Sequence, residues 1–398
     1  MGRSGIQNPV SDCCNLQSAV CSLPVSAIYI HIPFCVRKCL YCDFTSYEGM
    51  EKLFEPYVEA LKAEIRQSAA RFPDARISTI YFGGGTPTVL PQEQLEGILA
   101  EIRQSFPVAE DAEITIESNP GVSVLTLHTP RSTLHNRLSL GIQSLHDNEL
   151  RLLGRIHTTQ DAVQAFRDAR EAGFQNISLD LMYGIPAQTM QSWRETLKKA
   201  LKLSPEHISL YSLTVEEGTS FHKMHQAGEL TLPGNDIEAD MYEEAIRVLT
   251  AAGFIHYEIS NFAKPGYESR HNTTYWQNEP YFGFGAGATS YLEGIRAANT
   301  TDVKGYIRRI ETGQEIKVSE EHLTGRASMG ETMFLGLRML RGVDMDAFAR
   351  RHGRSLEEVF PAETAQLTKR GLIEKTDGFI RLTHTGLFLA NEVFAEFV

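Results

Sequence analysis

The chain has 398 residues and a formal net charge of −12, from 38 Lys and Arg against 50 Asp and Glu. This acidic balance argues against nucleic acid or an anionic membrane surface as a partner, because the cations that would neutralise phosphates are in deficit. No apolar run approaches the roughly 20 residues that a membrane-spanning helix requires, so no integral membrane segment is expected.

Residues 1–24 predict a poorly structured N-terminal extension. They contain one basic residue, Arg3, and no continuous apolar segment, which disfavours both a secretory signal and an Arg-rich transit peptide. All six cysteines lie within the first 42 residues, so the rest of the chain folds without disulfides, as expected of a protein in the reducing cytoplasm. Cys13, Cys14 and Cys21 are interpreted as bystanders rather than ligands.

From Val25 onward, short apolar segments alternate with amphipathic ones, a pattern that predicts a parallel sheet with intervening helices. Strands are predicted at 28–32, 77–82, 113–117, 137–143, 177–182 and 207–212, and helices at 51–71, from Pro91, at 159–172 and at 190–203. Six β/α units are too few to close an eight-stranded barrel, so we expect an α/β fold with a partial (β/α)6 TIM-type barrel and an open flank.

Two further segments shape the expected domain organisation. The segment 122–135 is rich in β-branched residues and contains Pro130, so no regular helix is expected there. After a helix at 235–252, we expect the barrel domain (25–260) to give way to a second domain at 261–398. That domain is predicted to be mostly helical and to end like a winged helix, with strands 372–374 and 379–382.

The charge of the C-terminal region argues against DNA binding. Residues 321–398 carry 10 Lys and Arg against 11 Asp and Glu. A DNA-reading winged helix needs a basic surface, which is missing here. We therefore interpret this region as a lid or docking module.

Three cysteines follow the first predicted strand at C-x3-C-x2-C spacing: Cys35, Cys39 and Cys42. Three thiolates can ligate three irons of a 4Fe-4S cluster, which leaves the fourth iron open to an exogenous donor. A structural zinc site needs four ligands, and no fourth cysteine follows Cys42. A disulfide would leave one thiol over, so the spacing favours the cluster.

Polar and glycine-rich positions lie at or near the ends of several of the predicted strands. The carboxyl ends of parallel strands converge on one rim, where sites are built. The positions expected at this rim are Tyr29, Gly84, Glu117, Gln143 and Asp180. Strand-to-helix turns are often polar without a function, but their coincidence with the cysteine loop favours a binding site.

The segment 271–276, HNTTYW, places an imidazole beside two large aromatic rings. Histidine is a common axial ligand of heme iron, and flat aromatic rings suit a porphyrin face. A single histidine is more often a hydrogen-bonded structural residue, so this pattern alone leaves the role of His271 open. His31, His157 and His256 are weaker candidates.

The residues 29–35 (YIHIPFC), 38–39 (KC) and 41–44 (YCDF) resemble the opening of radical S-adenosyl-L-methionine (SAM) proteins of the coproporphyrinogen dehydrogenase group, and most closely the heme chaperone (HemW) branch. The resemblance extends to the C-terminus. It implies a 4Fe-4S cluster whose open iron is chelated by SAM and can split SAM to a 5′-deoxyadenosyl radical. It also implies that the HNxxYW segment binds heme, with His271 as the iron contact.

The resemblance also assigns residues around SAM. It implies that Gly84, Gly85 and Thr86 flank the methionyl end and that Tyr29 and Tyr41 border the cofactor. Positions implied to hydrogen-bond SAM are Glu117, Gln143, Arg155 and Asp180. For a buried Glu, Arg or Asp, an internal ion pair is the alternative.

Departures from the relatives separate the functional alternatives. Coproporphyrinogen dehydrogenases carry a fourth cysteine where this chain has Phe44, and a longer N-terminal segment, which disfavours porphyrinogen decarboxylation. Thr289 stands where the heme chaperone branch usually has histidine, so heme handling is expected to be weaker if that histidine contributes.

The resemblance therefore implies a cytoplasmic heme chaperone that passes heme to respiratory-type apoproteins, with an electron donor as a further partner and a homodimer left open. A coproporphyrinogen III dehydrogenase or another tetrapyrrole-modifying radical SAM enzyme is the alternative. A third class, an electron-transfer protein that uses the cluster alone, is disfavoured by the glycine loop and the rim residues.

Overall fold

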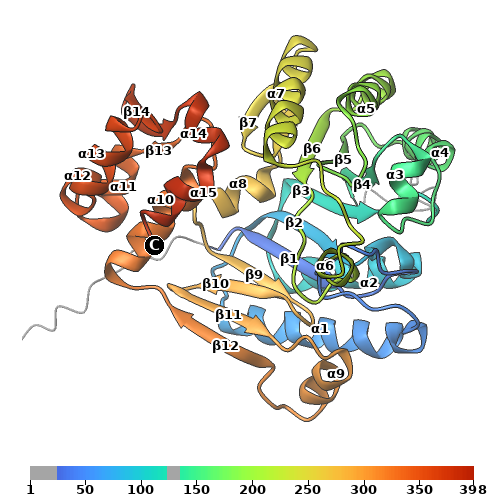
Figure 1. Ribbon diagram of the computed structural model, residues 1–398. Coiled ribbons are helices and arrows are strands. Elements are labelled where there is room, and N and C mark those ends of the chain that lie inside the picture. Colours follow the sequence, from blue (N-terminus) through green and yellow to red (C-terminus); the bar gives the residue numbers. More distant parts are fainter. Residues whose placement is uncertain (1–24, 123–134) are drawn as a thin grey trace, which may run out of the picture.

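The computed structural model describes residues 25–122 and 135–398. The predicted N-terminal extension with its three cysteines lies outside these residues, as does nearly all of the segment 122–135. Within the described residues, twelve strands form one curved sheet in the order β12-β11-β10-β9-β1-β2-β3-β4-β5-β6-β8-β7. Figure 1 shows this sheet at the centre of the molecule, with the C-terminal unit to one side.

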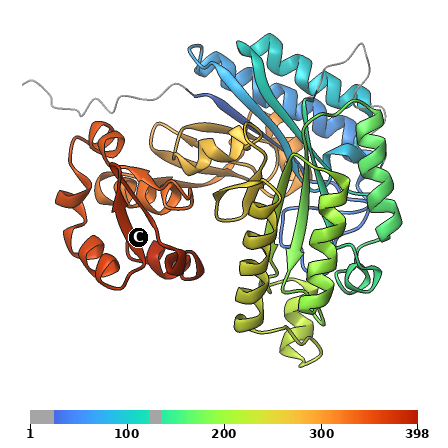
Figure 2. The same ribbon diagram turned by 90° about the horizontal axis from the view of Figure 1, so that it is seen from above.

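The six predicted strands lie side by side in chain order and in parallel, which confirms the partial barrel. They are β1 (Ala27–Ile32), β2 (Ile77–Gly84), β3 (Val108–Ser118), β4 (Arg137–Gln143), β5 (Ile177–Tyr183) and β6 (His207–Ser212). The helices between them are α1 (Phe54–Arg71), preceded by a 3-10 turn at Glu51–Leu53, α2 (Gln92–Ser105), preceded by one at Pro87–Val89, α3 (Asp147–Leu152), α4 (Thr159–Glu171) and α5 (Met190–Leu203). These helices cover the outer side of the curved sheet (Figure 2).

Side-chain alternation separates the two faces of the barrel sheet. Ile28, Ile30 and Ile32 of β1 are fully buried in the main hydrophobic core under the helices. Successive side chains of a strand point to opposite faces, so Tyr29 and His31 face the concave side. The same alternation holds in β3 and β5, where isoleucines and leucines enter the core while acidic residues face inward. The concave side is therefore polar.

The sheet continues on both sides of the barrel strands through short strands that the sequence pattern did not reveal. These strands are β7 (Ile255–Glu258), β8 (Asn261–Ala263), β9 (Tyr281–Phe284), β10 (Thr289–Leu292), β11 (Ile295–Asn299) and β12 (Lys317–His322). The helices in this part of the chain are α6 (Ser220–Gln226), α7 (Asn235–Ala251), which matches the predicted helix at 235–252, α8 (Arg270–Trp276) and α9 (Val303–Glu311). Strand β9 pairs in parallel with β1, and β8 pairs antiparallel with β6. Each strand has only three to six residues, too few for a clear period of two.

The predicted domain boundary at residue 260 cuts through this sheet. Phe282, Phe284 and Tyr306 belong to the same core as the barrel strands. A separate core begins at Met333 and extends to Phe397. We therefore propose that the second structural unit begins near Leu323 rather than at 261.

The C-terminal unit is mostly helical with a small sheet, as predicted. It contains α10 (Gly325–Gly336), β13 (Val343–Asp344), α11 (Met345–His352), α12 (Leu356–Val359), α13 (Pro361–Lys369), β14 (Ile373–Thr376), β15 (Phe379–Leu382), α14 (His384–Phe388) and α15 (Ala390–Ala395). The three strands pair in the order β13-β15-β14, which gives the expected winged-helix-like hairpin. No helix in the described ranges combines the length and apolar character needed to cross a bilayer.

Candidate functional site

The three cysteines lie on the irregular loop after β1, as free and partly exposed thiols. Among residues 25–122 and 135–398, no three His, Cys, Asp or Glu side chains converge as a single metal ion would require, so the zinc alternative gains no support. A cubane cluster spreads its ligands over separate irons and does not need such convergence. Burial raises the pKa of the Cys35 and Cys42 thiols.

Hydrogen bonds join the cysteine loop to the ends of the neighbouring strands. The Thr86 hydroxyl lies 3.7 Å from Cys35 Sγ and accepts a hydrogen bond from Asn119 Nδ2 over 2.7 Å. Arg155 Nη2 donates to Asn119 Oδ1, and Arg155 Nη1 donates to Cys39 Sγ over 3.3 Å. Polar donors aimed at cysteine sulfurs are what an iron-sulfur cluster uses to stabilise its charge, so this loop fits the group.

The glycine loop is shaped by its contact with the cysteine loop. A Cβ on Gly85 would lie 2.5 Å from the Phe34 carbonyl oxygen, and one on Gly84 would lie 2.6 Å from the His31 ring. Gly84 also has φ of +108°, which favours glycine. Its N–H donates to Glu117 Oε2 over 3.2 Å, so this donor already has a protein partner.

In the described part of the chain, Glu117 and Asp180 are held by hydroxyl donors, and Arg137 acts on both through its charge without a direct ion pair. Glu117 accepts a hydrogen bond from Tyr81 over 2.7 Å, and burial raises its pKa to about 7. Asp180 accepts hydrogen bonds from Ser139 at 3.0 and 3.1 Å, and burial also raises its pKa. Within the described residues, Glu117, Asp180 and Arg155 form no ion pair with any other side chain. The internal ion pair alternative is therefore not supported.

Two of the positions expected at the rim lie deeper than predicted. Tyr29 is the third residue of β1 and pairs with Tyr81, and Asp180 is the fourth residue of β5 and pairs with Ser209. Both were predicted at or near strand ends, and the parallel pairing continues three residues beyond each of them. Both face the concave side.

The remaining predicted SAM residues lie around the loop. Gln143 does end its strand, with φ of 66°, and its amide lies beside Gly141. Tyr41 is in ring contact with Phe221 at 6.3 Å, and burial raises its pKa. The structure thus brings Thr86 and Arg155 to the cysteines and leaves Asp180 further down the concave face.

The His271 imidazole is buried, and both of its nitrogens are engaged. Nδ1 lies 2.9 Å from Thr79 Oγ1, and Nε2 lies 2.8 Å from the Tyr275 hydroxyl. Burial, with a smaller effect of Arg137, lowers the His271 pKa to about 3, so the ring is neutral. Glu113 fixes this end of α8 by accepting the His271 N–H over 3.0 Å. Iron ligation would therefore require one of the two ring contacts to open.

The other histidine candidates are also held by hydrogen bonds. His31 lies between the Tyr29 hydroxyl and the Thr45 carbonyl oxygen. His157 Nε2 lies 3.2 Å from the Ile142 carbonyl oxygen, and His256 Nε2 lies 3.2 Å from that of Ile259. Burial lowers the pKa of His157 and of His256 to about 4.

Tyr81 links the two predicted sites, and the sequence pattern gave it no role. Its ring stacks on His271 with centroids 5.1 Å apart, while its hydroxyl donates to Glu117. Arg137, at the start of β4, is only 2 % exposed and was also missed. Both residues could have been found from the sequence, because each is a polar side chain within a mostly apolar strand. Each also stands at one of the alternating positions whose side chains face the concave side of the sheet.

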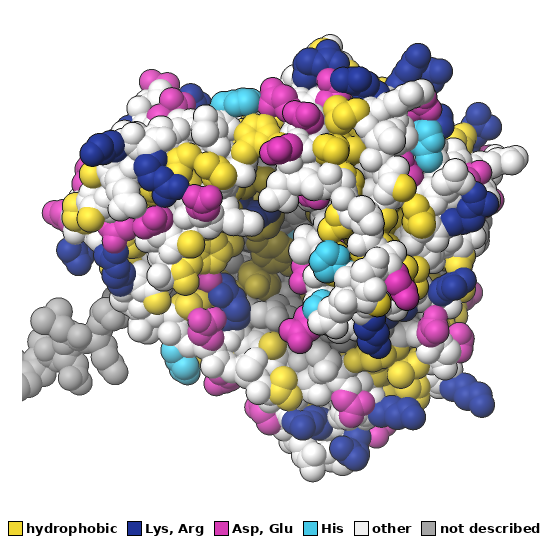
Figure 3. Space-filling model, viewed as in Figure 1, with side chains coloured by type: hydrophobic (Ala, Val, Ile, Leu, Met, Phe, Trp, Pro, Cys, Tyr) yellow, Lys and Arg dark blue, Asp and Glu magenta, His cyan; other side chains and the backbone are white. Residues whose placement is uncertain are grey.

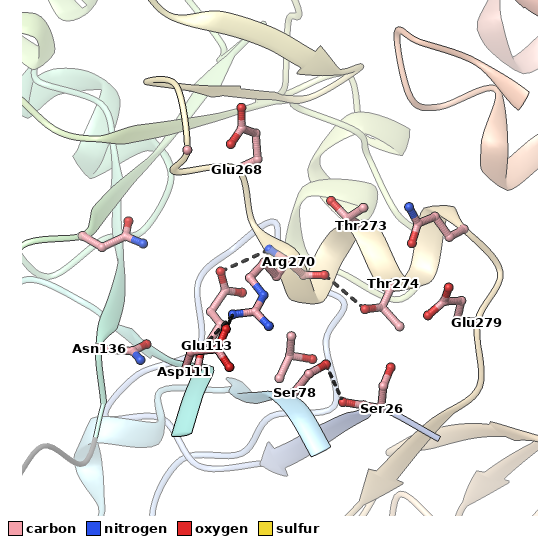
Figure 4. A pocket seen from close by; sticks show the side chains of 14 residues that line it. Ser26, Ser78, Asp111, Glu113, Asn136, Glu268, Arg270, Thr273, Thr274 and Glu279 are labelled. Atoms are coloured by element: carbon pink, nitrogen blue, oxygen red, sulfur yellow. Dashed lines mark hydrogen bonds and ion pairs between the residues drawn. The ribbon is translucent and has the colours of Figure 1, made fainter. Parts of the chain in front are cut away.

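A cavity of about 590 Å³ opens at the opposite ends of the barrel strands, away from the cysteines. Figure 4 shows that Arg270 reaches toward Asp111 and Glu113 at its wall. Thr79, which contacts His271, lines the cavity, so the imidazole lies close to it. Figure 3 shows a separate hollow with apolar side chains at its base, between the barrel and the C-terminal unit.

Comparisons with known proteins agree with this architecture. Residues 29–200 match the radical SAM superfamily, and residues 323–389 match the HemN C-terminal domain. The chain is 43% identical to the heme chaperone HemW of Bacillus subtilis (strain 168), over 94% of this chain and 99% of that protein. It is 32% identical to the heme chaperone HemW of Escherichia coli (strain K12), with the same coverage. The solved structure of coproporphyrinogen III oxidase HemN from Escherichia coli, a radical SAM enzyme, is similar with a TM-score of 0.81 and 25% identity, over 94% of this chain and 90% of that one.

Proposed function

Because the chain belongs to the heme chaperone HemW family of radical SAM proteins, we propose that it binds heme and transfers it to heme-requiring apoproteins. The radical SAM domain implies a 4Fe-4S cluster and SAM. The observation that carries the proposal is the position of Tyr81, which contacts both the predicted heme histidine and the rim beside the cysteine loop. A change at one site can therefore reach the other through one side chain.

We propose that Cys35, Cys39 and Cys42 ligate three irons of the cluster. The fourth iron would bind SAM, whose cleavage supplies a carbon radical when the cluster donates an electron. Arg155 and Thr86 hold the cysteine loop in place through the hydrogen bonds described above. The residues proposed to border SAM are Tyr29, Tyr41, Gly84, Gly85, Thr86, Glu117, Gln143, Arg155 and Asp180.

We propose that His271 contacts the heme iron after the Tyr275 hydroxyl releases Nε2. Tyr275 is partly exposed as a whole residue, and in this proposal its side chain turns toward the exposed side while α8 keeps its place. Thr79 would keep its contact with Nδ1 and hold the imidazole in orientation. Trp276, also partly exposed, would supply a flat apolar face for the tetrapyrrole.

Coproporphyrinogen dehydrogenation is the second candidate, because the chain shares the fold of HemN over nearly its whole length. Phe44 weighs against it. This side chain takes the place of the fourth cysteine in those enzymes and is 62% exposed beside the cysteine loop. The exposed ring offers no thiol for the chemistry that such a cysteine would support.

The partners follow from the same proposal. We propose respiratory-type apoproteins as heme acceptors and an external electron donor for the cluster, and a homodimer as the assembly to test. A cytoplasmic location is supported by the free thiols of the cysteine loop, since a reducing compartment preserves them.

Anaerobic reconstitution with iron and sulfide, followed by heme titration and by incubation with coproporphyrinogen III, SAM and a reductant, separates the two candidates. The chaperone proposal expects saturable heme binding and no porphyrinogen product. Protoporphyrinogen formation without heme binding would favour the dehydrogenase.

A further inference from the structure

Two neighbouring side chains, at the place where the C-terminal unit joins the barrel, each hold a nitrogen donor that lacks an acceptor within the described residues. The guanidinium carbon of Arg338 lies 4.4 Å from the centroid of the Trp276 ring. Arg338 Nε and Trp276 Nε1 are both buried atoms, and neither finds a hydrogen-bond acceptor among the described residues. Buried donors are nearly always paired in folded proteins, so two adjacent unpaired donors mark a place where an acceptor is missing.

A carboxylate close to Arg338, that of Glu258, does not fill this place. Glu258 is fully buried, and Arg338 partly offsets the effect of burial that raises the Glu258 pKa, so the two groups are close. However, Glu258 Oε1 accepts its hydrogen bond from Asn261, and Oε2 has no partner within the described ranges. Glu258 therefore balances part of the charge of Arg338 but satisfies neither unpaired donor.

The backbone around Arg338 is fixed to the barrel. Its carbonyl oxygen accepts the Ile259 N–H over 3.0 Å, and Leu340 N–H donates to the Tyr257 carbonyl oxygen over 3.0 Å. Helix α10, which leads into this segment, packs on α8, which carries Trp276. Figures 1 and 2 place α8 on the side of the barrel strands that faces the C-terminal unit, to which α10 belongs, and Figure 3 shows the hollow between the barrel and this unit. Both side chains are partly exposed as a whole, whereas the two donor atoms are buried, so a ligand would bind them once the exposed end of the Arg338 side chain moves aside.

Resting on the proposed heme function, we propose that Arg338 and the indole N–H of Trp276 bind a propionate carboxylate of the tetrapyrrole. A carboxylate has two oxygens with lone pairs, enough to accept from both donors, and the planar guanidinium matches its geometry. The Trp276 ring supplies the flat surface beside which a tetrapyrrole lies. Trp276 therefore contributes a polar contact in addition to apolar area.

The test compares ferric heme with its dimethyl ester, which keeps the iron and the ring but has no carboxylate. Both are titrated into the anaerobically reconstituted protein and into the variants Arg338→Met, which removes the cation, and Trp276→Phe, which keeps an aromatic ring but removes the N–H. Arg341→Met is the matched control, because Arg341 also stacks on an aromatic ring, that of Phe379 at 4.3 Å, but is exposed on the C-terminal unit.

We expect the unmodified protein and Arg341→Met to bind heme about tenfold more tightly than the ester, the scale of one charge-assisted hydrogen bond. In Arg338→Met this preference should shrink to about twofold or less, and in Trp276→Phe it should fall in between. The ratio within each variant remains informative even where overall affinity changes, and unchanged cluster content checks the fold.

Two outcomes would overturn the inference. An equal preference for heme over the ester in Arg338→Met and in the unmodified protein would place the carboxylate elsewhere. Equal binding of heme and ester by the unmodified protein would mean that no carboxylate is recognised. In both cases the heme proposal itself survives, whereas failure to bind either compound would contradict the proposed function.

Discussion

Arg155 donates a hydrogen bond from Nη1 to Cys39 Sγ over 3.3 Å, while its other terminal nitrogen bonds to Asn119 and to the Gly141 carbonyl oxygen. A side chain from the loop after α3 thus brings a positive charge to the cysteine loop, 116 residues away in the sequence. Tyr41 and the cysteines raise the Arg155 pKa against the opposing effect of burial, so the guanidinium remains charged. The contact predicts that Arg155 influences the proposed cluster as well as the proposed SAM site.

Replacing Arg155 with Met should leave the iron content unchanged and lower the reduction potential of the cluster. The reduced cluster is more negative, so a cation and a donor at Cys39 favour reduction. If the reduced cluster loses about 1.5 kcal/mol of stabilisation, its one-electron reduction potential falls by about 60 mV. Potentiometric titration followed by electron paramagnetic resonance measures this change. Arg151→Met is the control, since Arg151 contacts Asn148 and not the cysteines; an equal shift in both variants would show that the effect is general charge.

Replacing Cys35, Cys39 or Cys42 with Ala should abolish the cluster, because each is proposed to hold a separate iron. Reconstituted unmodified protein should contain about four irons, and its spectrum should change when SAM is added. The matched control replaces Cys13, Cys14 and Cys21 together, which should retain full iron content. A Cys39→Ala protein with a complete cluster would refute the ligand assignment.

The sequence predicted the barrel strands well, because hydrophobic residues such as Ile28, Ile30 and Ile32 record both the strand and its buried face. It failed where strands are short: β9 and β10 were assigned to a second domain, although Phe282 and Phe284 pack in the barrel core. Such strands are held by pairing with strands that are distant in the sequence, and four residues are too few to show the alternation of apolar and polar residues that predicts a strand.

The site was predictable in its residue types but less so in its geometry. The cysteine spacing and the glycine loop predicted one cluster site, and the structure brings the two loops into contact. The hydrogen bond of His271 to Thr79 depends on how α8 docks against β2, which no local pattern encodes, whereas its bond to Tyr275 joins residues four apart on one helix. For the same reason the link through Tyr81 could be found only in the folded chain.

Replacing Tyr275 with Phe should increase the rate of heme binding, because it removes the hydroxyl that occupies His271 Nε2. His271→Ala should change the heme absorbance spectrum and impair heme transfer, without affecting the cluster on its separate loop. Stopped-flow absorbance after mixing with ferric heme measures the binding rate and the heme spectrum, and mixing the loaded protein with a heme-free acceptor measures transfer. His157→Ala is the control, as its imidazole is buried next to a different carbonyl group. An unchanged spectrum and transfer rate in His271→Ala would show that heme is held elsewhere.

The stability of the protein should fall between about pH 5 and 7 because of Glu64. Burial raises the pKa of this carboxyl from 4.5 to about 7, although it accepts hydrogen bonds from Tyr306, Gly285 and Asn299. In this range the folded protein holds a proton that the unfolded chain has released, so rising pH favours unfolding until the folded pKa is passed. From the difference between the folded and unfolded pKa values of Glu64, the free energy of unfolding should fall by about 3 kcal/mol at most.

Thermal unfolding midpoints measured from pH 5 to 8 would reveal this dependence. Glu64→Gln should have a shallower decline than the unmodified protein, though not a flat one, since Glu117 has a similarly raised pKa. Glu59→Gln, on the exposed side of the same helix, should retain the full decline. Equal declines in both variants would assign the pH dependence to other groups.

Heme transfer tests the central claim most directly. The reconstituted protein is loaded with ferric heme, freed of excess heme, and mixed anaerobically with a heme-free respiratory cytochrome, and the absorbance of the acceptor is followed with time. We predict that the acceptor gains the spectrum of its heme-bound form as the donor loses heme, faster than it does from an equal amount of free heme. Retention of heme by the loaded protein, with an acceptor that stays heme-free, would contradict the chaperone function.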